Sequence, residues 1–98
     1  MFDKNEINKR YFDIKLDKLE LEIEPPKLET LKKIMNLSKS RNAEAVSGLA
    51  EAVGMILNKN KSSYVVSDKI IDELDMDQLN ELLSAFFEWL NKEKSSKN

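Results

Sequence analysis

Residues 12–23 read FDIKLDKLELEI, in which apolar and polar side chains alternate with a period of two on either side of Asp17 and Lys18. This period is typical of a strand with one buried face, because an amphipathic helix repeats every 3.6 residues. If Asp17 and Lys18 form a two-residue turn, Leu16 lies opposite Leu19 and the six apolar side chains share one face of a hairpin. The run therefore predicts an antiparallel β-hairpin, although Asp-Lys lacks the glycine that tight turns prefer and a slightly longer loop would also serve.

Helical spacing begins after Pro25 and Pro26, which remove two backbone donors and end the strand. The spacing predicts one helix from Lys27 to the polar run at residues 38–42, and a second from Ala43 to about Asn58. Asn42 is the expected N-cap of the second helix. The expected buried face of the first helix comprises Leu28, Leu31, Ile34 and Met35, with Leu37 or Ser38 as a further candidate. That of the second comprises Val46, Leu49, Val53, Ile56 and Leu57.

The second helix contains Gly48 and Gly54. Each glycine costs about 1 kcal/mol of helix propensity relative to alanine, so close packing against a neighbouring element is the expected reason for both.

Two further helices are expected after a solvated linker at residues 58–63 and a short extended piece at residues 64–66. Ser67 is the expected cap of a short helix that ends near Leu74, and Asp77 is the expected cap of a long one from Gln78 to about Lys92. The apolar stripe of the last helix comprises Leu79, Leu82, Leu83, Phe86 and Leu90.

These elements predict a mainly α (α+β) fold: a small domain of about four helices with an N-terminal β-hairpin. With 98 residues, the chain has room for one modest core. We expect a flexible arm at residues 1–9, a single domain at residues 10–93 and a flexible tail at residues 94–98.

The composition excludes most familiar catalytic sites. The chain contains no cysteine and no histidine, so it lacks thiol nucleophiles, thiolate metal sites and the commonest general base. We expect no enzyme activity, no catalytic residues and no cofactor. No apolar run approaches the roughly 20 residues that span a bilayer, and no signal-peptide pattern opens the chain, which predicts a cytoplasmic protein that does not bind membranes.

Charge is distributed unevenly along the chain. Residues 27–62 carry seven basic and three acidic side chains, whereas residues 67–93 carry two basic and eight acidic ones. These opposite charges can meet within one chain or between copies in a homo-oligomer, and the sequence leaves both open. Nucleic acid is not an expected partner, because phosphate binding needs clustered Lys and Arg with few carboxylates.

Carboxylates gather near Asp75 and Asp77, together with Asp68, Asp72 and Glu73. Several carboxylate oxygens suit a divalent cation, but no glycine turn or twelve-residue loop pattern accompanies them. Helix capping and a solvated acidic face explain the cluster better, so no metal site is predicted.

The aromatic cluster Phe86, Phe87 and Trp89 is the most informative feature of the chain. Three such side chains within four positions cannot all face one core from a single helix. Phe86 is expected in the core, while Phe87 and Trp89 belong either to the core or to an exposed surface that binds a partner. The expected partner-binding residues are Phe87, Trp89, Leu83, Phe86 and Leu90.

The order of hairpin, Pro25-Pro26, helix pair and the final segment DMDQLNELLSAFFEWL at residues 75–90 resembles small tail assembly chaperones of long-tailed bacteriophages and prophages. The resemblance covers roughly residues 10–93 and is sharpest at LLSAFFEW, residues 82–89. It implies a protein that is not an enzyme, binds the tape measure protein, keeps it soluble and helps recruit tail tube subunits, and is shed from the mature tail. The family offers no motif of binding residues to carry over.

A second hypothesis is a structural or regulatory phage protein, such as a tail completion component or a small helical oligomer that binds a host protein. The presence of the chain in purified virions would favour this hypothesis, because a chaperone is shed. Enzyme activity is a distant third, which a tightly bound ion or cofactor would indicate.

Overall fold

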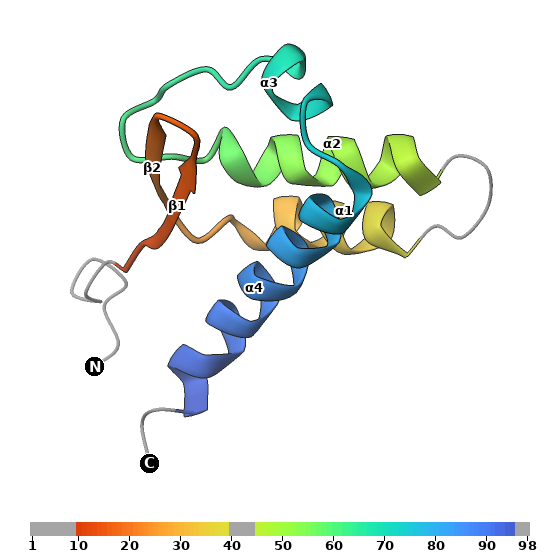
Figure 1. The fold of residues 1–98 in the computed structure, drawn as a ribbon. Coiled ribbons are helices and arrows are strands. Elements are labelled where there is room, and N and C mark those ends of the chain that lie inside the picture. The colour runs from red at the N-terminus through yellow and green to blue at the C-terminus, as the bar shows by residue number, and fades with distance from the viewer. Residues whose placement is uncertain (1–9, 40–44, 96–98) are drawn as a thin grey trace.

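A computed structural model of the chain describes residues 10–39 and 45–95, with side chains described as far as residue 91. It contains a two-stranded hairpin followed by four helices, as the sequence predicted (Figure 1). In chain order the elements are β1 (Phe12–Leu16), β2 (Leu19–Ile23), α1 (Leu28–Ser38), α2 (Ala45–Leu57), α3 (Asp68–Asp72) and α4 (Met76–Ser95). The expected arm at residues 1–9 and the expected Asn42 cap lie outside the described residues.

The hairpin has the predicted register. Phe12 pairs with Ile23, Ile14 with Leu21 and Leu16 with Leu19 in an antiparallel ladder. The turn forms without glycine because Asp17 adopts a φ of 56°, a left-handed conformation that aspartate tolerates better than most residues. Leu21 and Ile23 are buried, and the other four apolar side chains are partly buried against the same core.

The segment after α2 is only in part the solvated linker that its composition indicated: residues 61–63 are exposed, but Asn60 is buried. Its backbone lies along β2: the amide of Glu24 donates to the carbonyl of Lys59, and the amide of Lys61 donates to the carbonyl of Glu22, both at 2.8 Å. Between them Asn60 forms a bridge with Ile23 and is only 5% exposed. The backbone groups on the free edge of β2 need partners, and this segment supplies them.

Two asparagine side chains hold the next part of the loop. The Asn60 side chain accepts from the amide of Tyr64 and donates to the Tyr64 carbonyl, each at 2.8 Å. Asn58 does the same for Val66, at 2.8 and 3.3 Å. Residues 64–66 therefore form no strand: side-chain amides take the place of a strand partner. This arrangement buries Val66 in the core.

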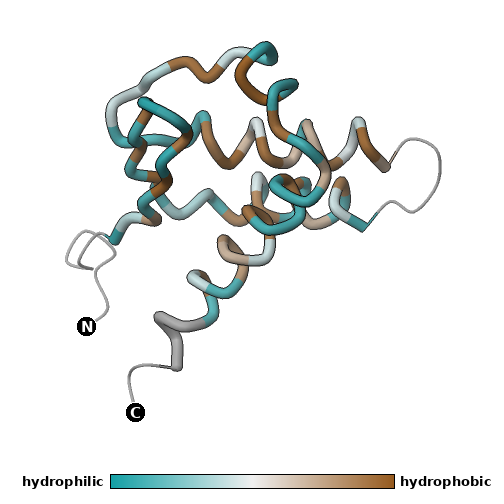
Figure 2. Tube along the Cα trace, in the orientation of Figure 1, coloured by the Kyte–Doolittle hydropathy of each residue, from teal (hydrophilic) through white to brown (hydrophobic). Residues whose placement is uncertain are grey.

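Helix α2 is the centre of the domain, because α1, α3, α4 and β2 all pack against it. Hydrophobic segments recur along its whole length (Figure 2). Of its predicted core residues, Leu49, Val53, Ile56 and Leu57 are buried. Val46 is the exception at 55% exposure, because it lies in the first turn, at the end of α2 away from the hairpin (Figure 1).

Helix α1 buries only part of the face predicted for it. Ile34 is fully buried and Leu31 partly so, but Leu28 is 66% exposed and Met35 is 42% exposed. The α1 backbone at Leu37 approaches α2 closely, so the buried face is rotated toward Ile34 and Leu37. The periodicity identified one wide apolar face, of which α2 covers only part.

Helix α4 begins earlier than predicted and is capped by Asp75 instead of Asp77. The Asp75 carboxylate accepts from the amide of Gln78 at 2.8 Å, and the amide of Asp75 donates to the Gln78 side chain at 2.9 Å. This reciprocal pair is a capping box. Ser67 occupies the predicted N-cap position of α3, but its side chain makes no capping hydrogen bond. The other end of α4 extends to Ser95, past the expected end near Lys92.

Gly48 and Gly54 provide a matched test of helix packing. A Cβ at position 48 would lie 2.7 Å from the backbone carbonyl oxygen of Leu37, whereas one at position 54 would lie 3.0 Å from the terminal methyl group of Ile71. A backbone atom cannot move aside, but a side-chain methyl group can. We expect Gly48→Ala to lower the free energy of unfolding by about 1–3 kcal/mol and Gly54→Ala to change it by less than about 1 kcal/mol. Urea unfolding of both variants checks this, and equal losses would contradict it.

Candidate partner-binding surface

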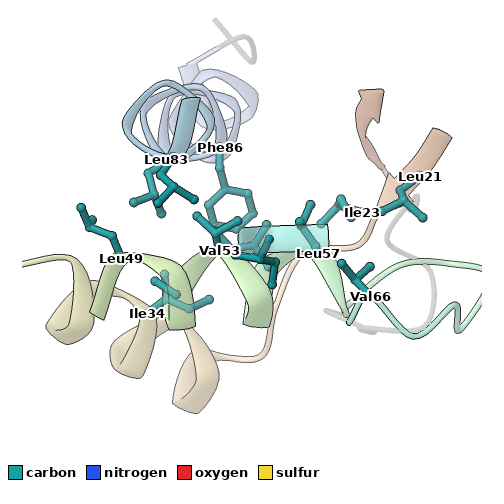
Figure 3. Close-up of a cluster of buried hydrophobic side chains, with 13 residues drawn as sticks. Leu21, Ile23, Ile34, Leu49, Val53, Leu57, Val66, Leu83 and Phe86 are labelled. Atoms are coloured by element: carbon teal, nitrogen blue, oxygen red, sulfur yellow. The ribbon is translucent and has the colours of Figure 1, made fainter. Parts of the chain in front are cut away.

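Two of the five expected partner-binding residues lie in the core. Phe86 is fully buried and Leu83 is nearly so. Both point from α4 toward α2, where Val53 and Leu49 lie (Figure 3). In this conformation neither side chain offers surface to a partner, so both serve to attach α4 to α2.

Trp89 joins α4 to the hairpin. Its ring stacks on that of Phe12, with centroids 5.5 Å apart and planes inclined by 30°. The guanidinium carbon of Arg10 lies 4.4 Å from the centroid of the Trp89 ring, and Arg10 Nη1 donates to the Trp89 carbonyl at 3.1 Å. The indole is only partly exposed as a result. Cation–π attraction and the hydrogen bond to the Trp89 carbonyl together hold Arg10 in place, and stacking holds Phe12 against the same ring.

Phe87 and Leu90 line an open groove between α1 and α4. Phe87 packs edge-to-face against Phe86, with centroids 5.6 Å apart, which leaves another part of its ring facing the groove. The groove has a volume of about 500 Å³. Its lining residues are Leu31, Met35, Ser38 and Lys39 from α1, Phe87, Leu90 and Asn91 from α4, and Arg10. Of the five predicted residues, Phe87 and Leu90 therefore reach a surface where a partner can bind.

The groove has an apolar floor and a basic edge. Lys39 lies at the end of α1 and Arg10 at the foot of the hairpin, and no carboxylate of the described residues lines the groove. The ion pairs in residues 10–39 and 45–91 are formed elsewhere, between Lys59 and Glu24 at 3.4 Å and between Lys61 and Glu22 at 4.0 Å. Within that part of the chain, the basic middle therefore forms ion pairs with Glu22 of β2 and with Glu24 just after it, and none with the acidic last third.

Sequence analysis did not identify Arg10, Leu31, Met35 or Lys39 as binding residues. Leu31 and Met35 were assigned to the core because periodicity alone does not show which part of a wide apolar face is covered. No local signal marks Arg10, since its position depends on the contact between the hairpin and α4.

The acidic cluster forms no metal site in the described part of the chain, where no three Asp, Glu, His or Cys side chains come together. Asp75 acts as the helix cap described above. Within that same part, no helix is long and apolar enough to cross a membrane.

Comparison of the chain with protein-family models, with curated proteins and with solved structures found no match.

Alanine substitutions should distinguish the contributions of the three aromatic residues of α4 to the free energy of unfolding. Phe86→Ala should reduce the free energy of unfolding by about 3–5 kcal/mol, because it empties a fully buried site. Trp89→Ala should cost about 2 kcal/mol through the lost contacts with Phe12 and Arg10, and Phe87→Ala about 1 kcal/mol or less. Thermal and urea unfolding measure all three. Equal losses would show that the whole cluster is ordinary core.

Proposed function

We propose that this chain is a phage tail assembly chaperone that binds the tape measure protein, keeps it soluble and helps recruit tail tube subunits. The observation that supports this proposal best is the apolar groove between α1 and α4, next to the segment with the sharpest resemblance to that family. A tape measure protein is a long and largely helical chain with apolar stripes, and it aggregates unless these stripes are covered.

The groove suits such a client because two helices form its walls. An apolar groove between helices takes the apolar face of a third helix, with side chains spaced three, four and seven residues apart. Met35 at 42% exposure and the partly exposed Phe87 present the apolar contacts that this mode requires. Charged side chains around the groove keep the free protein soluble.

Co-expression tests the proposal. The chain should raise the soluble yield of the tape measure protein encoded nearby by several-fold and should co-purify with it. Phe87→Ala should weaken the complex without unfolding the chain, whereas Val65→Ala should not, because Val65 is exposed and lies outside the groove.

A client that is equally soluble without the chain would contradict the proposal. Stoichiometric presence of the chain in purified virions would also count against a chaperone and would favour a structural tail component.

A further inference from the structure

Helix α1 carries an exposed apolar stripe that extends the groove. Leu31 and Met35 follow Leu28 by three and by seven residues, so all three lie on one face of the helix. Leu28 is 66% exposed and Met35 is 42% exposed. At 1.5 Å per residue the stripe is about 10 Å long, or two helical turns. Phe87 and Leu90 face it from α4 with a spacing of three residues. This length and spacing match the apolar face of a single helix.

Basic side chains border this stripe. Lys32 and Lys39 are seven residues apart on α1 and follow one edge of the stripe, four residues after Leu28 and after Met35 respectively. Arg10 borders the groove from the hairpin side and is held there by the Trp89 ring. In the ranges 10–39 and 45–91, none of these three cations lies within ion-pair distance of a carboxylate. Among the described side chains no carboxylate neutralises these charges, and we expect them to attract acidic side chains of a partner.

We infer that the groove between α1 and α4 binds an amphipathic helix whose apolar stripe is flanked by acidic side chains. The inference deepens the proposed function and rests on it, since it specifies the chemistry of the client segment. Carboxylates beside the client's stripe would meet Arg10, Lys32 and Lys39 while its apolar face covers Met35 and Phe87. Such charge complementarity selects among helices that share the same apolar spacing.

Helix α1 of a second copy carries the same apolar stripe, but Lys32 and Lys39 border it, so it would bring like charges to the groove instead of carboxylates. Helix α4 of a second copy lacks such a stripe. The exposed side of α4 is acidic, with Asp77, Glu81 and Glu88, but its single large exposed hydrophobic side chain is Met76. One methionine does not make a stripe that fills a groove two turns long. The groove therefore fits a helix from another protein better than it fits α4 of a second copy.

Two synthetic helical peptides test the inference. Both are about 18 residues long and carry the same leucines at spacings of three, four and seven, but one has glutamates beside the stripe and the other has lysines. Fluorescence anisotropy with the full chain at low salt should show about tenfold tighter binding of the glutamate peptide. Its glutamates form weak surface ion pairs with Arg10, Lys32 and Lys39, whereas the lysines of the other peptide are repelled by them. Added salt should reduce that preference.

Paired variants locate the binding site. Met35→Lys should abolish binding of the glutamate peptide, whereas Val46→Lys should not, because Val46 is also exposed, at 55% against 42% for Met35, but lies on α2 outside the groove. Lys39→Glu should remove most of the preference for glutamate, whereas Lys33→Glu, an exposed position on another side of α1, should leave it unchanged. Circular dichroism confirms that each variant is folded.

Equal binding of the two peptides, or equal effects of Met35→Lys and Val46→Lys, would overturn the inference. A chain that dimerises by itself and becomes monomeric with Met35→Lys would also overturn it, by assigning the groove to a second copy.

The failure of the inference can be told from the failure of the proposed function. A tape measure complex that survives both Met35→Lys and Lys39→Glu would refute the groove as the binding site and leave the chaperone function standing. Tight binding of the glutamate peptide without any effect on the tape measure protein would refute the chaperone function alone.

Discussion

The burial of α2 is the constraint on which the rest of this structure depends. Three other helices and one strand pack against it, and its side chains at Ala52, Val53, Ile56 and Leu57 are almost completely shielded from water. A domain of this size has room for one core, so an element buried on several sides determines where every neighbour lies. Gly48 shows how tight this arrangement is, because the backbone of α1 occupies the space that a Cβ would need.

The candidate binding surface follows from the same constraint. Helix α1 uses Ile34 and Leu37 against α2, and this orientation turns Leu28 and Met35 outward. Helix α4 uses Leu83 and Phe86 against α2, which leaves Phe87 and Leu90 at the edge of the core. The apolar side chains that the core does not cover therefore lie next to one another between α1 and α4. A protein that binds apolar helices needs such a surface. Here it arises because the apolar faces of α1 and α4 are each wider than the part that α2 covers.

Local patterns predicted the hairpin, the four helices and most of the core, because each depends on periodicity. The register of the hairpin followed from the alternation and from a two-residue turn, which leave no other pairing that buries all six apolar residues. The Asp75 cap also has a sequence signature, since Gln78 follows three residues later, although the predicted cap is Asp77.

Features that depend on contacts between distant segments were not predictable in this way. Asn58 and Asn60 sit in a polar run that resembles a solvated loop, yet Asn60 is buried and its side chain replaces a strand partner for Tyr64. Arg10 and Phe12 meet Trp89 only after the hairpin has packed on α4. For the candidate site, periodicity identified Phe87 and Leu90 but also included Leu83 and Phe86, because it gives the width of an apolar face and not the part that is covered.

Hydrogen exchange measured by mass spectrometry, on the chain alone and in complex with the tape measure protein, tests the central claim most directly. The account predicts slower exchange on complex formation at residues 31–39 and 87–91, which form the two sides of the groove. Exchange in α2 should not change, since it is already buried. Protection confined to the hairpin or to α3, with unchanged exchange at the groove, would contradict the account.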